Sequence, residues 1–145
     1  MNTNDICLTR VFTTNSPVGG VLDTTPNEIG GLTRNTFWFT IEAEAGENMG
    51  ALLATYWLIV TATSTTGGNP GFVRIRRQER VGFGGDGWTH VLPNLGWRKS
   101  QTIAVNTTQF PPDEGYELHV RIVGLAGSGI LCKLASNEFY VFPVP

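Results

Sequence analysis

Hydrophobic and polar residues alternate along several stretches of the chain, with the two-residue period of a half-buried β-strand. The clearest example is residues 37–45, where Phe37, Phe39, Ile41 and Ala43 share one face. Polar residues dominate the opposite face of this stretch, as expected for a surface in contact with water. The pattern therefore predicts a strand with one face in the core.

Residues 51–64 are apolar on both faces and rich in β-branched and aromatic residues, which is typical of a central strand. Helix propensity at the start of this stretch leaves a short helix near 45–54 as an alternative. A polar turn at 64–71 separates it from residues 72–80, so the two stretches predict a β-hairpin. Further strands are predicted at 6–13, 88–92, 101–107, 116–123, 130–135 and 138–143.

Eight to ten short strands without a convincing helix predict an all-β fold, most simply an antiparallel β-sandwich. The chain has 145 residues, which suits one hydrophobic core, and its 18 Gly and 8 Pro suit many turns. No repeat, linker or low-complexity stretch divides it. We therefore expect a single soluble domain covering residues 1–145.

The segment from Pro111 to Ile122 resembles the entry to strand F of fibronectin type III and immunoglobulin-like domains. The resemblance implies that Tyr116 is the corner tyrosine of an immunoglobulin-like sandwich. It also implies that Leu118, Val120 and Ile122 face the core. Such sandwiches have many unrelated activities, so the resemblance predicts architecture and not function.

Trp57 similarly resembles the buried tryptophan of strand C in the immunoglobulin pattern. The two cysteines, Cys7 and Cys132, do not fall on strands B and F, so the inter-sheet disulfide of antibody domains is not expected. We expect both thiols to be reduced.

Composition excludes several classes of partner. A formal net charge of −2 and a pI of 5.6 predict no binding to nucleic acid or to an anionic membrane. The most apolar stretch, 51–62, falls short of the roughly 20 residues that span a bilayer, and the N-terminus lacks the pattern of a signal peptide. These features favour a cytoplasmic protein, or a part of a particle assembled in the cytoplasm.

Gly82, Gly84 and Gly87 match the spacing of a dinucleotide-binding turn. The residues that follow, Trp88–Pro93, are strand-like, so no helix dipole would face a phosphate and we expect only a flexible loop. Neither His90 nor His119 has the spacing of a metal site. We therefore predict no metal and no cofactor.

Enzymatic candidates are few. His90 lies near Asp86 in the sequence, which leaves a small hydrolase as a third hypothesis, but no nucleophile elbow accompanies them. Alternation places His119 on the outer face of its strand, between Glu117 and Arg121. The protein is therefore not expected to be an enzyme.

A cluster of arginines forms the only basic concentration. Alternation places Arg74, Arg76 and Arg80 on one face with Gln78. They could bind a carboxylate-rich or sulfated partner. The alternative is that they protect an edge strand from unwanted pairing.

Residues 82–97 form the best candidate site, because a Gly-rich loop there carries aromatic and polar side chains. Exposed aromatic rings stack on sugars or anchor protein interfaces, although core packing would bury at least one of the two tryptophans. The candidate residues are Phe83, Asp86, Trp88, His90, Asn94 and Trp97.

The C-terminal run 139–145 is apolar on both faces, so we expect Tyr140 or Phe142 to contact a neighbouring subunit or another element. The leading hypothesis is a non-catalytic recognition or assembly module that binds a protein partner or itself. The second is a carbohydrate-binding module centred on Trp88 and Trp97.

Overall fold

The computed structural model describes most of the chain. The described residues are 5–14, 27–29, 36–51, 54–68, 70, 75–111, 114–125, 129–136 and 138–141. Within them, none of the helices is long and apolar enough to cross a membrane.

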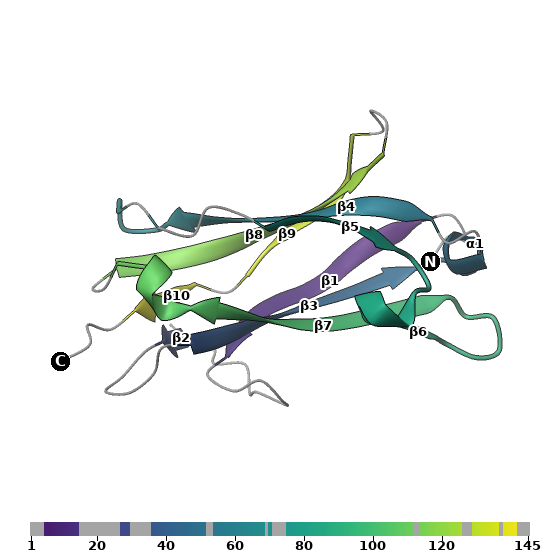
Figure 1. The fold of residues 1–145 in the computed structure, drawn as a ribbon, viewed down its shortest axis with the longest axis horizontal. Helices are drawn as coiled ribbons and strands as arrows, with labels where there is room; N and C mark the ends of the chain where they lie inside the picture. The colour runs from purple at the N-terminus through teal and green to yellow at the C-terminus, as the bar shows by residue number, and fades with distance from the viewer. Residues whose placement is uncertain are drawn as a thin grey trace.

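Two β-sheets pack face to face (Figure 1). The four-stranded sheet has the order β1 (Ile6–Thr14), β3 (Thr36–Ala45), β7 (Trp97–Asn106) and β6 (Trp88–His90). The six-stranded sheet has the order β2 (Asn27–Ile29), β10 (Phe139–Val141), β8 (Glu114–Gly124), β4 (Thr55–Ser64) and β5 (Ile75–Arg80), and β9 (Ile130–Ala135) also pairs with β8. Three short helices complete the described part: α1 (Glu47–Ala51), η1 (Gly84–Asp86) and η2 (Thr107–Gln109).

This strand order is that of an immunoglobulin-like sandwich, with β1, β3, β7 and β6 in the positions of strands A, B, E and D. Strands β4 and β8 take the positions of C and F. All described pairings are antiparallel except that of β2 with β10. The predicted all-β sandwich is confirmed, whereas β2 was not predicted from the sequence.

Strands β9 and β10 lie along the same edge of β8, one after the other. Ser136 joins them: its backbone N–H donates to Leu118 O at 2.8 Å, and its Oγ accepts from Leu118 N at 2.9 Å. The pairing with β8 therefore continues across the break between the two strands.

The core lies between the sheets and follows the predicted alternation. Phe37, Phe39 and Ile41 of β3 are fully buried, and so are the inward residues of β8. These β8 residues are Tyr116, Leu118, Val120 and Ile122. Removal of this apolar surface from water is the main force that holds the sheets together.

Tyr116 forms the predicted corner. Its hydroxyl donates to the backbone carbonyl of Pro111 at 2.6 Å, five residues upstream. Its ring packs edge-on against Phe110, with the centroids 5.1 Å apart. The tyrosine-corner prediction is therefore confirmed.

The predicted role of Trp57 as a buried strand-C tryptophan is wrong. Tyr56 and Leu58 point into the core, so the alternation of β4 places Trp57 on the outer face, where it is half-buried. There the guanidinium carbon of Arg76 lies 4.2 Å from the centre of its ring.

Candidate functional site

The segment from Gly82 to Trp97 connects β5 to β7 and is more regular than the expected flexible loop. It forms a turn, the single 3₁₀ turn η1 and then β6. Gly87 has a φ of 88°, and a Cβ there would lie 2.7 Å from Ser100 O, so the close approach of η1 to β7 requires glycine. A strand follows the glycines, as predicted.

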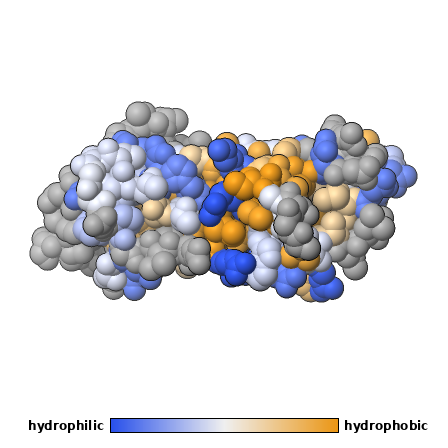
Figure 2. Space-filling model, turned by 90° about the horizontal axis from the view of Figure 1, so that it is seen from above, coloured by the Kyte–Doolittle hydropathy of each residue, from blue (hydrophilic) through white to orange (hydrophobic). Residues whose placement is uncertain are grey.

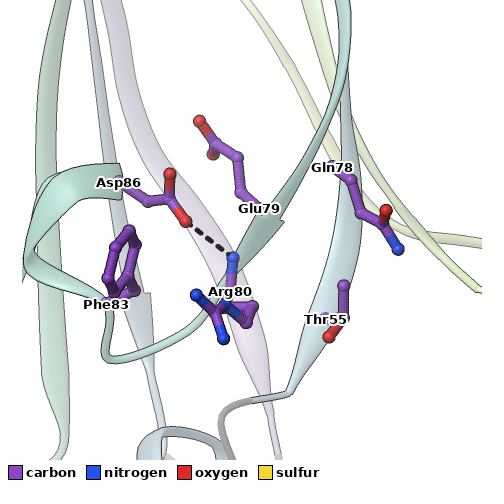
Figure 3. A pocket seen from close by; sticks show the side chains of 6 residues that line it. All are labelled: Thr55, Gln78, Glu79, Arg80, Phe83 and Asp86. Atoms are coloured by element: carbon purple, nitrogen blue, oxygen red, sulfur yellow. Dashed lines mark hydrogen bonds between the residues drawn. The ribbon is translucent and has the colours of Figure 1, made fainter.

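Asp86 holds the start of this segment against β5. Its Oδ2 accepts the backbone N–H of Arg80 at 2.9 Å (Figure 3). A hollow of about 350 Å³ lies beside this contact, lined by Thr55, Gln78, Glu79, Arg80, Phe83 and Asp86. The Arg80 guanidinium lies 4.7 Å from the centre of the ring of Phe83, a residue that is 44% exposed.

Trp88 belongs to the core. Its side chain is only 4% exposed, and its indole N–H donates to the hydroxyl of Tyr56 at 3.1 Å. Because a stacking ring must face the solvent, Trp88 cannot serve as the proposed sugar platform. The expectation that at least one of the two tryptophans is buried is confirmed.

A buried ion pair lies directly beside Trp88 and joins the two sheets. Lys99 of β7 and Glu79 of β5 are 0% and 2% exposed, and Lys99 Nζ lies 3.1 Å from Glu79 Oε1. Lys99 Nζ also donates to the backbone carbonyl of Asp86. Burial lowers the pKa of Lys99, whereas the Glu79 carboxylate acts in the opposite direction.

Three further side chains surround the Glu79 carboxylate. Tyr56 donates to Oε1 at 2.7 Å and Gln101 to Oε2 at 3.2 Å, while Arg77 Nε lies 3.1 Å from Oε2. Burial and the Glu79 charge raise the pKa of Tyr56 well above its ordinary value. This cluster was not predicted from the sequence, although the alternation that turns Arg76 outward also turns Glu79 inward.

His90 pairs with Glu47 of α1. Its Nε2 lies 2.7 and 2.9 Å from the two carboxylate oxygens of Glu47, and its ring stacks on Trp97 with the centroids 4.4 Å apart. Asp86 instead binds the backbone of β5. The structure therefore does not bring together the two residues of the hydrolase hypothesis.

His119 also lies beside a hydroxyl and a carboxylate, on the outer face that the sequence predicted. Its Nε2 is 3.0 Å from Thr63 Oγ1 and 3.7 Å from Glu117 Oε2. A catalytic histidine contacts its nucleophile and its orienting carboxylate through different nitrogens. Because both groups meet Nε2, this arrangement cannot relay a proton from hydroxyl to carboxylate.

Residues 91–96, which we call the hairpin tip, expose two leucines. Leu92 is 75% and Leu95 is 72% exposed, and Asn94 between them is exposed with a φ of 93°. Beneath the tip lies a hollow of about 220 Å³, lined by Glu44, Ala45, Val91, Leu95, Trp97 and Arg98.

The arginine-bearing strand β5 is the last strand of its sheet. This is the position at which charged side chains protect a sheet edge from unwanted pairing. Arg76, Gln78 and Arg80 are exposed on its outer face. Arg74 and Phe142 lie outside the described residues, and so does the side chain of Tyr140.

Within the described ranges, no three His, Cys, Asp or Glu side chains form a group that could hold a metal ion. Comparison with known proteins assigns no relationship: no protein-family model matches the chain, and no curated protein matches it significantly in sequence.

Proposed function

We propose that the protein is a non-catalytic recognition or assembly module that binds a protein partner, or a second copy of itself, through the hairpin tip. The observation that carries this proposal is the exposure of Leu92 and Leu95 at the end of a hairpin. Large apolar side chains that protrude together are typical of a surface that a partner covers.

Hydrogen bonds within the hairpin tip and to α1 support its conformation. The Glu47 carboxylate of α1 accepts from His90 on one strand and, at 2.9 Å, from the backbone N–H of Gly96 on the other side. Val91 N donates to Gly96 O, and Leu95 N to Val91 O, both at 2.9 Å. A partner would therefore meet a preorganised surface, which lowers the entropic cost of binding.

The test compares the double variant Leu92→Ser/Leu95→Ser with Phe83→Ser, which removes another exposed apolar side chain of the same segment. We expect the wild type to form a complex heavier than the 15.8 kDa monomer, either alone at high concentration or with a partner from its native source. Light scattering should show that complex for Phe83→Ser and not for the double variant. A wild type that remains monomeric and brings no partner would contradict the proposal.

Carbohydrate binding is the second candidate, now centred on Trp97 alone. Trp97 is half-buried and lines the 220 Å³ hollow beside Glu44 and Arg98, a combination of ring and charged groups that suits a sugar. Binding to a glycan array that is lost in Trp97→Ala but kept in Leu92→Ser, which changes a tip leucine that does not line the hollow, would favour this candidate over the first.

A further inference from the structure

The outer face of the six-stranded sheet carries two adjacent rows of side chains that differ in character. Strand register places Trp57 beside Val123, and Val123 beside Ile130, in an apolar row. The next row runs across the same strands from Arg76 through Ile59 and Arg121 to Lys133. Figure 2 looks down on this face and shows hydrophobic residues in its middle with hydrophilic residues around them. We call these two rows the basic face.

The cations of the basic face lack acidic partners. Within the part of the chain that the structure describes, none of Arg76, Arg121 and Lys133 forms an ion pair with a carboxylate. Arg121 and Lys133 lie directly opposite each other in the β8–β9 ladder, an arrangement of like charges that destabilises a sheet. The pairing of Arg121 with Lys133 therefore carries an energetic cost that an acidic partner would relieve.

A hollow marks the position where an acidic group would lie. It measures about 350 Å³ and is lined by His119, Arg121 and Lys133, together with Val120, Leu134 and Ala135. Arg121 and Lys133 both line this hollow, and their side chains carry several N–H donors. The apolar row lies on the neighbouring positions of the same strands.

We propose that the basic face binds an acidic segment of a partner protein, with carboxylates between Arg121 and Lys133 and an apolar side chain on the row of Trp57, Val123 and Ile130. A second copy of this chain fits poorly, because two-fold pairing through the basic face would place the cations of one copy against the cations of the other. Nucleic acid also fits poorly, since one row of three cations neutralises few phosphates. This surface lies on the sheet opposite to that of the hairpin tip, so it is a site beyond the function proposed above.

The test uses two short peptides with the ¹⁵N-labelled protein in NMR titrations. The acidic probe is acetyl-Glu-Glu-Phe-Glu-Glu-amide, and the neutral probe has glutamine in place of each glutamate. We expect the acidic probe to shift the Trp57 indole N–H signal and the backbone signals of 119–123 and 130–135, and to bind less tightly as salt rises. The neutral probe should cause much smaller shifts at equal concentration.

Arg121→Glu should weaken binding of the acidic probe by about tenfold or more. It should not unfold the protein, because Glu at this position would face Lys133 across the ladder. The matched control is Arg98→Glu, the same charge change on β7 of the other sheet, which should leave binding unchanged.

Three results would overturn the proposal: no shifts at millimolar acidic probe, equal binding of the neutral probe, or equal losses in the two variants. Tighter binding of a heparin fragment or a DNA oligonucleotide at the same signals would also reject a protein partner. The leucine variants of the hairpin tip should bind the probe as the wild type does, so failure of one site can be distinguished from failure of the other.

Discussion

Tyr116 and Tyr56 place the same hydroxyl group in two different surroundings. Tyr116 makes one strong hydrogen bond, to the Pro111 carbonyl, near the end of the sandwich. Tyr56 lies inside, donating to Glu79 and accepting from Trp88. The consequences of removing each hydroxyl follow from what it leaves unpaired.

Tyr116→Phe should lower the free energy of unfolding by about 1 kcal/mol, the usual net value of one hydrogen bond. Tyr56→Phe should cost more, since it leaves a buried indole N–H without its acceptor and removes a donor from a buried carboxylate. Urea denaturation of both variants measures the difference. An unchanged midpoint for Tyr116→Phe would contradict the corner hydrogen bond.

Both tyrosines predict a loss of stability in alkali. Burial and the Glu114 carboxylate raise the pKa of Tyr116 to about 12 from its ordinary value of 10.0, and the pKa of Tyr56 is raised as well. Above pH 10.0 the unfolded chain releases tyrosine protons that the native state keeps, so the free energy of unfolding falls toward pH 12. The pKa of Lys99 is lowered from its ordinary value of 10.5. Below pH 10.5 the unfolded chain therefore holds a lysine proton that the native state has released, so Lys99 makes the free energy of unfolding rise with pH in that range only.

Denaturation midpoints measured from about pH 9 to about pH 11.5 should show this decline. The double variant Tyr56→Phe/Tyr116→Phe is the control, and its decline should be shallower. Equal slopes in the two proteins would show that other groups control alkaline unfolding.

At the scale of elements, the alternation of hydrophobic and polar residues was sufficient to predict most strands, because their inner and outer faces differ in polarity. Residues 37–45 were predicted almost as β3 begins and ends, and α1 lies within the range left open for a short helix. Strand β2 was missed because three residues, Asn27–Ile29, are too few to show a period. The prediction for Trp57 was wrong because the resemblance to strand C was applied to Trp57, whereas the aromatic residue that faces inward is its neighbour Tyr56.

Helix α1 has a larger role than its length suggests, because Glu47 connects it to both sides of the hairpin tip. Glu47→Gln removes the negative charge of the carboxylate that accepts hydrogen bonds from His90 and Gly96. We expect the free energy of local opening at the tip to fall by about 1 kcal/mol. Hydrogen exchange at the amides of residues 95 and 96 measures it.

Glu44→Gln makes the same charge change on the adjacent strand β3 without removing a contact to the tip. Exchange at the tip should be unaffected in this control. Faster exchange throughout the sandwich in Glu47→Gln would mean that Glu47 supports the whole fold and not the tip in particular.

At the scale of the molecule, the contact between Lys99 and Glu79 joins the two sheets through charge, within a core that is otherwise packed by apolar side chains. No pattern within one strand predicts it, since the partners are 20 positions apart and belong to different sheets. The same limit applies to the candidate site: residues 82–97 were predicted from the sequence as one unit, but the contacts of His90 with Glu47 and of Asp86 with β5 depend on tertiary structure.

Lys99→Met should destabilise the protein by about 3–5 kcal/mol, because it removes one of the two cations beside the buried Glu79 carboxylate. Adding Glu79→Gln should recover part of this loss by removing the carboxylate charge that has lost this partner. Calorimetric or urea unfolding of the two single variants and the double variant gives the coupling. Strictly additive losses would mean that the two side chains contribute independently.

The positions of the first and last strands determine how the sandwich would respond to mechanical tension. β1 begins at one end of the long axis and β10 ends at the other (Figure 1). A force applied between these two points would run along the strands. It would shear the β1–β3 ladder and the parallel β2–β10 ladder, so that several hydrogen bonds carry the load together. We therefore expect extension along this axis to require more force than peeling the strands apart across it.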